Sequence, residues 1–224
     1  MLELFTVRIE PLPAYVIRRL LEQVSADRQR RYERFRIEAD AVRSLFSELV
    51  VRRIVMERNG IHNDAIVFGA NAHGKPKLVH PVGMHYNVSH SGDWVVCAIS
   101  DEPVGIDIEQ IKPIDMEISR RFFSAIEHEQ LMELPEMERV NRFYELWALK
   151  ESFVKAVGKG LSMPLDSFSF RFECDGVIQL RAPAPYERFS GCLLEIDEAY
   201  KLAVCSSKEQ QMSKINTWST IDWL

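Results

Sequence analysis

The chain has 224 residues, of which 46% are hydrophobic, and its formal net charge is −5. This length and composition allow one large domain or two small ones with a full core. The negative charge argues against nucleic-acid binding, and apolar runs such as Trp94 to Ile99 are too short to span a membrane. No signal peptide follows Met1, so we expect a cytoplasmic protein, and we expect it to be a monomer.

The first marked element is a helix that begins after Ser25, with Asp27 in its first turn. A basic stretch runs from Arg28 to Arg36 along this helix. On its own, such a stretch is explained by a solvated helix face. Farther along the chain, Gly74 and Pro76 predict a turn.

The middle of the chain predicts two strands and a polar turn. The segment Asn87 to Ser91 lies directly before the apolar run Trp94 to Ile99. We interpret it as a turn whose hydroxyls, imidazole and amides lie where phosphates are commonly held. From Val104 to Glu109 apolar residues alternate with others, which indicates a strand with Asp107 and Glu109 on one face.

A second helix is predicted before Gly158 and Gly160, which mark its end. Glu151 and Lys155 lie one turn apart on the same face of this helix. Its apolar stripe consists of Phe143, Leu146, Trp147, Phe153, Val154 and Val157. Upstream, Ser124 predicts another helix cap, with Glu127 in the first turn behind it.

Three acids on two of these elements, Asp107, Glu109 and Glu151, form a candidate Mg²⁺ site. Carboxylates on rigid elements suit a hard cation that also binds substrate phosphates, with lysines beside it for the remaining anionic oxygens. Ligands at zinc spacing are absent. Taken alone, each piece favours a solvated strand face or helix surface, so the acids by themselves give only a candidate.

VGIDIE followed by WALKESFVK resembles the paired signature of the 4'-phosphopantetheinyl transferases. The NVSHS segment, the Lys75-Pro76 pair and the length resemble the Sfp-type subgroup (Sfp, Gsp, HetI and AcpT) of bacterial nonribosomal peptide synthesis. The resemblance runs from about Ser25 to about Leu165. It implies a holo-carrier-protein synthase that moves the phosphopantetheine arm of coenzyme A onto a serine of a peptidyl or acyl carrier protein. Adenosine 3',5'-bisphosphate leaves, and the subgroup implies a role in antibiotic synthesis.

The resemblance also implies roles for individual residues. Asp107, Glu109 and Glu151 match the family's metal ligands for Mg²⁺, with Mn²⁺ as the alternative ion. Bridging the diphosphate of coenzyme A with a divalent ion neutralises charge on the leaving group. Lys150 and Lys155 match its helix lysines, and Lys155, together with Glu151, is expected to act in catalysis.

The remaining matches are expected to form the coenzyme pocket. Ser89 and His90 match phosphate contacts, and Lys75 and Pro76 match a segment that lies against the adenine. Arg28, Arg31 and Ser44 stand where the family binds the 3'-phosphate, although the family often has lysine at the first two positions. Glu127 follows an RRFFS segment as in the family, and we expect it to accept the proton of the carrier serine. A metal-bound water is the alternative acceptor, and a plain helix-start glutamate is the structural alternative.

The implied fold is α/β (α+β), with two similar subdomains related by a pseudo-twofold axis and the active site in the cleft between them. We expect residues 1–103 to contact the coenzyme and residues 104–224 to supply metal ligands and carrier docking. A shift of 99 residues places Ser25 on Ser124 and Arg52 on Glu151. A faint repeat of this kind fits two related halves.

The carrier protein is expected to dock on an apolar patch with a basic rim. Candidates lie between Ile111 and Phe123, particularly Ile114, Met116, Phe122 and Phe123. Two other functions stay open. One is a Mg²⁺-dependent phosphohydrolase or nucleotidyl transferase that uses the same acids, and the other is a non-catalytic carrier-binding protein.

Overall fold

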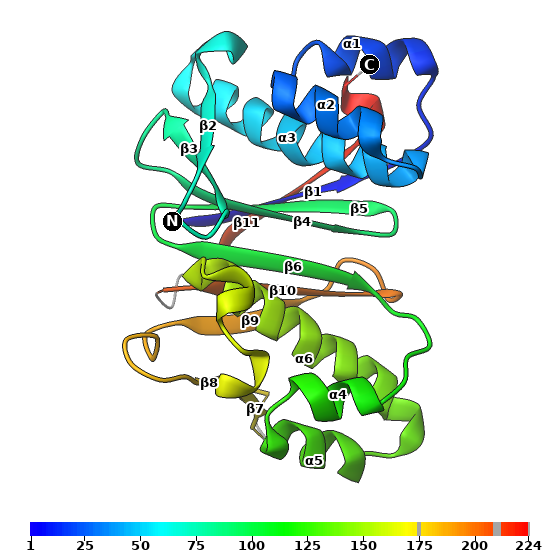
Figure 1. Ribbon diagram of the computed structural model, residues 1–224, viewed down its shortest axis with the longest axis vertical. Coiled ribbons are helices and arrows are strands. Elements are labelled where there is room, and N and C mark those ends of the chain that lie inside the picture. Colours follow the sequence, from blue (N-terminus) through cyan, green and yellow to red (C-terminus); the bar gives the residue numbers. More distant parts are fainter. Residues whose placement is uncertain (174–175, 208–211, 224) are drawn as a thin grey trace.

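The computed structural model describes residues 1–173, 176–207 and 212–223 (Figure 1). The elements of the first half are β1 (Leu2–Arg8), α1 (Ala14–Leu21), α2 (Ala26–Arg34), α3 (Glu38–Asn59), β2 (Val67–Ala70), β3 (Pro76–His80), β4 (His85–Ser91) and β5 (Trp94–Ser100). Those that follow are β6 (Val104–Gln110), α4 (Glu117–Phe122), α5 (Ala125–Glu133), α6 (Glu136–Val157), β7 (Ser169–Phe172), β8 (Ile178–Arg181), β9 (Ser190–Leu194), β10 (Tyr200–Ser206) and β11 (Met212–Ser219).

Two sheets are stacked at the centre of the molecule, with helices on the outer face of each (Figure 1). The first sheet has the strand order β11-β1-β5-β4, and the second has the order β6-β10-β9. Neighbouring strands are antiparallel, except that β11 runs parallel to β1. This arrangement is a mixed α+β fold, as the sequence predicts.

Strand alternation divides the apolar residues among three cores. Along β5, Val95, Cys97 and Ile99 pack under α1 and α3, whereas Trp94, Val96 and Ala98 face the second sheet. Both faces of β5 are therefore buried, which explains its unbroken apolar sequence. On β6, Val104, Ile106 and Ile108 fill the core between the sheets. Gly105, Asp107 and Glu109 alternate with them and are left on the α6 side.

The two halves repeat their helices and their strand pairing. Helices α3 and α6 have 22 residues each and end at glycines with positive φ, Gly60 at 61° and Gly158 at 76°. The pairing of Leu2 with Ser100 in the first half has its counterpart in the pairing of Val104 with Ser206. These repeats support two related halves, and the pseudo-twofold axis stays an interpretation.

The structure corrects the offset between the halves. Helices α2 and α5 differ by 99 positions, as predicted, but α3 and α6 start at Glu38 and Glu136, a difference of 98. Arg52 therefore corresponds to Lys150 rather than to Glu151. Both of these cations are buried and both bind a carboxylate, Glu48 and Glu127 respectively.

The last described strand returns to the first half. Strand β11 pairs with β1, and the turn after it brings Trp223 against Phe46, with ring centroids 5.3 Å apart. The guanidinium of Arg53 lies over the rings of Trp218 and Trp223, at 4.5 and 4.7 Å. Within the described ranges, no helix has the length and apolarity needed to cross a membrane.

Candidate active site

The acid-bearing strand β6 lies unusually close to α6 because residue 105 has no side chain. A Cβ atom at Gly105 would lie 2.0 Å from the carbonyl oxygen of Ser152 and 2.3 Å from the amide nitrogen of Ala156. Only glycine permits this approach. The close packing brings Asp107, two residues along the strand, within reach of Lys155 on the helix.

Asp107 is the centre of a buried polar cluster. Only 3% of the residue is exposed, and its Oδ1 accepts hydrogen bonds from Lys155 Nζ at 2.5 Å and from Ser89 Oγ at 2.8 Å. Lys155 Nζ also donates to Ser89 Oγ at 3.0 Å. The other oxygen, Oδ2, is buried and has no hydrogen-bond partner in the part of the chain that the structure describes. An orphaned carboxylate oxygen of this kind is costly unless a ligand completes it.

The three predicted metal ligands influence each other electrostatically. Burial raises the pKa of Asp107, against the opposing effect of Lys155. Burial and the Asp107 carboxylate raise the pKa of Glu109 to about 7, and the same two causes raise the pKa of Glu151. Across the described ranges, no three His, Cys, Asp or Glu side chains are grouped closely enough to hold a metal as they stand. Repelling carboxylates with an orphaned oxygen nevertheless suit a hard divalent cation.

The NVSHS segment forms strand β4, which corrects its interpretation as a turn. Alternate residues of β4 connect it to β6 in the other sheet. Asn87 Oδ1 accepts from the amide of Ile106 at 2.8 Å, and Ser91 Oγ accepts from the amide of Gln110 at 3.0 Å. Ser89, between them, binds Asp107. The polar motif therefore joins the two halves at the acid cluster.

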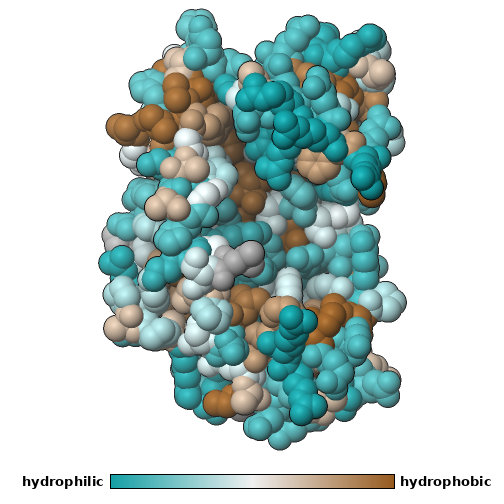
Figure 2. All heavy atoms as spheres, in the orientation of Figure 1, coloured by the Kyte–Doolittle hydropathy of each residue, from teal (hydrophilic) through white to brown (hydrophobic). Residues whose placement is uncertain are grey.

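The other face of β4 lines a pocket of about 770 Å³, to which Val88 and His90 contribute. Figure 2 shows the hollow between the β2–β3 hairpin and α2, with apolar residues on its floor. The predicted coenzyme residues among its lining are Arg28, Arg31, Ser44, Pro76 and His90. Its apolar wall consists of Ile66, Val67, Phe68, Tyr86 and Val88. Cations facing an apolar wall suit a ligand with a flat ring and anionic groups.

His90 stands between the pocket and the acid cluster. Burial lowers its pKa, and the Arg43 guanidinium and the Lys155 ammonium lower it further. The imidazole is therefore mostly neutral near pH 7, so one ring nitrogen is a donor and the other an acceptor.

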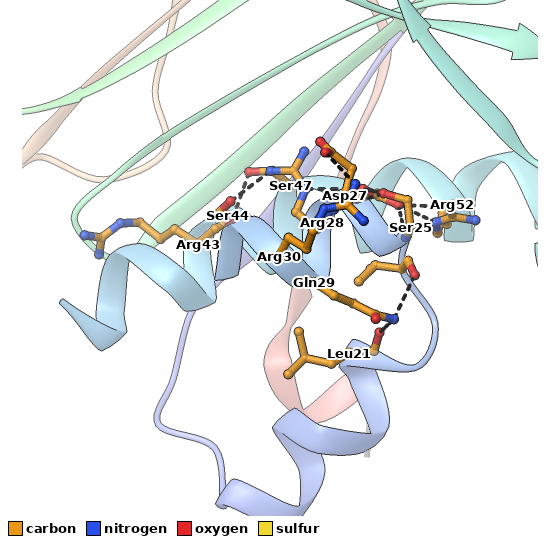
Figure 3. Close-up of polar contacts among 12 residues, drawn as sticks. Leu21, Ser25, Asp27, Arg28, Gln29, Arg30, Arg43, Ser44, Ser47 and Arg52 are labelled. Atoms are coloured by element: carbon orange, nitrogen blue, oxygen red, sulfur yellow. Dashed lines mark hydrogen bonds and ion pairs between the residues drawn. The ribbon is translucent and has the colours of Figure 1, made fainter. Parts of the chain in front are cut away.

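Arg28, one of the predicted pocket residues, is held in place by Glu48, a side chain that the sequence interpretation missed. Arg28 donates from Nη1 to Ser44 Oγ at 2.8 Å (Figure 3). It also donates from Nε to Glu48 Oε2 at 3.2 Å. Glu48 is only 6% exposed. The available signal is an acid inside the run Leu45 to Val51 of a helix, which is apolar apart from Glu48 and Ser47 and therefore predicts a buried and paired carboxylate.

Comparisons with known proteins identify the family of this chain. The family model described as 4'-phosphopantetheinyl transferase superfamily matches residues 103–205, and the one described as 4'-phosphopantetheinyl transferase, N-terminal, matches residues 11–102. The 4'-phosphopantetheinyl transferase psf-1 of Bacillus pumilus is 40% identical over 214 residues, covering 92% of this chain and 91% of the relative. The chain belongs to the 4'-phosphopantetheinyl transferase superfamily.

A second curated relative agrees with this membership. The 4'-phosphopantetheinyl transferase Sfp of Bacillus subtilis (strain 168) is 39% identical over 200 residues, covering 88% of both chains. A crystal structure of the holo-[acyl-carrier-protein] synthase (AcpS) of Thermotoga maritima is 20% identical, with a TM-score of 0.41. The matched region covers 49% of this chain and 64% of the Thermotoga maritima chain.

In this transferase, the neighbouring residues Lys75 and Pro76 contact different parts of the molecule. Pro76 lines the pocket, whereas the ammonium of Lys75 donates to the carbonyl oxygen of Val104 at 2.9 Å, at the start of β6. Burial lowers the pKa of Lys75 to about 8. Asn71 secures the same turn, because its Nδ2 donates to the carbonyl oxygen of Gly158 at 2.8 Å. The β2–β3 hairpin is therefore tied to both β6 and α6.

The structure places Glu127 and Lys150 together in the core instead of in the coenzyme site. Both side chains are 0% exposed, and Lys150 Nζ lies 2.7 Å from Glu127 Oε2. Lys150 also donates to the carbonyl oxygens of Leu165 and Phe168, at 2.8 and 2.9 Å. A fully enclosed ammonium with three acceptors has no donor left to contact a coenzyme directly.

Glu127 is equally occupied. Its Oε2 accepts from the amide and hydroxyl of Ser124, which completes a capping box, and its Oε1 accepts from the amide of Phe170 at 2.8 Å. Because every oxygen is bound and buried, the geometry favours the helix-start role over the expected role as proton acceptor.

The predicted carrier-docking residues are only partly available. Phe123 is 3% exposed and its ring stacks on Phe143 at 5.1 Å, so it belongs to the core. Ile114, Met116 and Phe122 are partly buried against the same core. These three keep some exposed surface at the C-terminal half, and their role in docking stays a prediction.

Proposed function

We propose that this transferase moves the phosphopantetheine arm of coenzyme A to a serine of a peptidyl or acyl carrier protein, with Mg²⁺, and releases adenosine 3',5'-bisphosphate. The observation that carries the proposal is the meeting of two features at β4. One face of the strand holds the buried acid Asp107 through Ser89, and the other face lines a cation-bearing pocket through His90. A ligand with both a diphosphate and a nucleotide matches this pair.

Asp107, Glu109 and Glu151 would hold the divalent cation. The unpartnered Oδ2 of Asp107 and the mutual repulsion of the acids support this assignment. When bound, Mg²⁺ would supply positive charge that stabilises the leaving diphosphate. We propose Mg²⁺ as the working ion, because carboxylate oxygens are hard ligands that suit it.

Several side chains of this chain would share the contacts to the anionic groups of coenzyme A. Lys155 and His90 lie beside the acid cluster, where they can bind diphosphate oxygens, and Ser89 orients Lys155. Arg28, Arg31 and Ser44 line the pocket and suit a 3'-phosphate, while Pro76 lies on the same wall as the apolar side chains that suit adenine. We also propose that the enzyme is a monomer.

With Glu127 enclosed in the core, Glu151 is the better candidate for accepting the proton of the carrier serine. Glu151 belongs to the acid cluster, where burial and the Asp107 carboxylate raise its pKa in the metal-free protein, and a carboxylate close to the reacting groups can accept a proton directly. Attack by the serine oxygen on the β-phosphorus of coenzyme A forms the new P–O bond. The bond to the leaving bisphosphate breaks, and the serine proton passes to Glu151.

The test is mass spectrometry of a recombinant apo carrier domain incubated with coenzyme A, Mg²⁺ and this protein. We expect the carrier serine to gain one phosphopantetheine, and Asp107→Ala and Glu151→Gln to abolish the gain while the fold is retained. Parallel reactions with a peptidyl and an acyl carrier domain, and with Mn²⁺, identify the preferred acceptor and ion. Cleavage of the diphosphate without a modified carrier would indicate a phosphohydrolase instead. Carrier binding without either reaction would indicate a non-catalytic partner.

A further inference from the structure

Glu48 is a buried acid at the base of the pocket, and four groups converge on it. Its Oε1 accepts from the amide of Ser25 at 2.7 Å and from Arg52 Nε at 2.8 Å. Its Oε2 accepts from Ser25 Oγ at 3.0 Å and from Arg28 Nε at 3.2 Å. Burial alone would raise its pKa, but the Ser25 amide and Arg52 lower it below the usual range. The carboxylate is therefore ionised and fully engaged.

The two pocket arginines of α2 differ in how firmly they are held. The guanidinium of Arg28 is fixed on one side by Glu48 and at Nη1 by Ser44, and its side chain is 20% exposed. Figure 3 shows Arg28 lying between Ser25 and Ser44 at the surface of α3. Arg31 lines the same pocket and is exposed, and its side chain has no hydrogen bond or ion pair to another described residue. One arginine is preorganised and the other is free to adjust.

We propose that Glu48 is a positioning residue that fixes the guanidinium of Arg28 for the 3'-phosphate of coenzyme A. The inference rests on the proposed function, because that function identifies the ligand of the pocket. A side chain already held in its binding orientation loses less rotamer freedom when the phosphate arrives. The planar fork of arginine makes this possible, since Nε and Nη1 bind the protein while Nη2 stays available.

A simple electrostatic effect would give the opposite result. Glu48 is negatively charged, so its removal should strengthen phosphate binding if only its field mattered. The charge is offset, however, by ion pairs with Arg28 and Arg52. We therefore expect the lost orientation of Arg28 to outweigh the lost repulsion between Glu48 and the phosphate. Weaker coenzyme A binding in the Glu48 variant would indicate the first effect, and tighter binding would indicate the second.

The experiment compares coenzyme A with 3'-dephospho-coenzyme A, which lacks only the 3'-phosphate, by calorimetry with the full chain. Glu48→Gln should weaken coenzyme A binding roughly three- to tenfold, the cost of ordering one long side chain. Binding of the dephospho compound should be unchanged. In an Arg28→Ala background, where no guanidinium remains to be positioned, Glu48→Gln should leave the ratio of the two affinities unaltered. Glu57→Gln is the matched control, because Glu57 lies on the same helix and pairs with Arg53 at 2.9 Å.

Equal weakening of both ligands by Glu48→Gln, or tighter coenzyme A binding, would overturn the proposal. The proposal would also be overturned if Glu48→Gln still changed the ratio of the two affinities in the Arg28→Ala background. If Glu48→Gln does not fold, Glu48→Asp keeps the charge and withdraws it by one methylene, and a smaller loss of the same sign is expected. Failure of the proposed function would be recognised separately, in the protein without substitutions. That protein would then bind coenzyme A and 3'-dephospho-coenzyme A equally, or it would transfer no phosphopantetheine to the carrier.

Discussion

The ammonium nitrogen of Lys155 lies 2.5 Å from Oδ1 of Asp107, while Oδ2 of the same carboxylate has no hydrogen-bond partner in the described ranges. A buried carboxylate needs a counterion, and here a lysine from α6 provides it. The side chain of Lys155 is 28% exposed, so it can also reach a ligand at the surface. Lysine and a divalent cation thus compete for Asp107 when no coenzyme is bound.

Replacement of Lys155 should separate cation binding from transfer. In Lys155→Met, Asp107 loses its competing counterion, so Mg²⁺ should bind the coenzyme-free protein more tightly at pH 8, by a few fold. Transfer to the carrier should nevertheless be lost, because the diphosphate loses its ammonium. Calorimetry with Mg²⁺ and carrier mass spectrometry measure the two effects. Weaker Mg²⁺ binding in Lys155→Met would show that the lysine supports the cation site instead of competing for it.

The junction between the sheets predicts a stability effect that is coupled to activity. Asn87→Ala leaves the buried amide of Ile106 without its acceptor, at a cost of about 1–3 kcal/mol in the free energy of unfolding. Transfer of phosphopantetheine should also slow, because Ile106 lies next to Asp107 on β6. Urea unfolding and the carrier assay measure both quantities. Asn216→Ala, which removes a side-chain bond to Leu4 in the first sheet, should reduce stability without slowing transfer.

The close approach of β6 to α6 predicts a strong effect at Gly105. Gly105→Ala places a methyl group 2.0 Å from a backbone oxygen, so β6 must shift and the acid cluster must separate from Lys155. We expect at least about 3 kcal/mol of destabilisation and loss of transfer, checked by thermal unfolding and the carrier assay. Gly83→Ala is the control. Gly83 has a φ of 88° with open space around it, so only a backbone penalty of about 1–2 kcal/mol is expected.

The sequence predicts the acid strand and its partner helix well because their patterns are strong. Alternation from Val104 to Glu109 gave β6, and the apolar stripe with Gly158 gave the helix and its left-handed end at a φ of 76°. The NVSHS segment predicts a turn instead of the observed strand, because its polar residues give no clear period. Their polarity is explained only by β6, a strand of the other sheet, which local sequence does not reveal.

Side-chain pairing inside the core was also beyond sequence patterns. Glu127 and Lys150 are 23 positions apart on different helices, and each alone is typical of a helix surface. Family resemblance assigned both to the active site. Burial of both side chains became evident only once α5 and α6 were placed in three dimensions. Glu48 was missed for the same reason, because its partners Ser25 and Arg28 lie on another helix.

The raised pKa of Glu109 predicts a pH-dependent effect of Mg²⁺ on stability. Its pKa in the folded protein is about 7, above its ordinary value of 4.5, so the folded state binds more protons between these values. The contribution of Glu109 to stability therefore falls as pH rises through this window. Mg²⁺ competes with those protons, so it should raise Tm more at pH 8 than at pH 5.5. Glu109→Gln should reduce this difference, and an equal Mg²⁺ effect at both pH values would contradict the assignment.

The buried pair of Glu127 and Lys150 allows a structural role to be separated from a catalytic one. Removal of one partner leaves an uncompensated buried charge, so Glu127→Gln alone should cost about 3–5 kcal/mol of unfolding free energy. The double variant Glu127→Gln with Lys150→Met removes both charges and should regain most of that loss. If Glu127 only stabilises the C-terminal half, the refolded double variant transfers phosphopantetheine at a rate near that of the unchanged protein. Urea unfolding and the carrier assay provide the two measurements. A double variant that is stable yet inactive would return Glu127 to the role of proton acceptor, whereas the same variant with normal transfer leaves Glu151 as the carboxylate for that step.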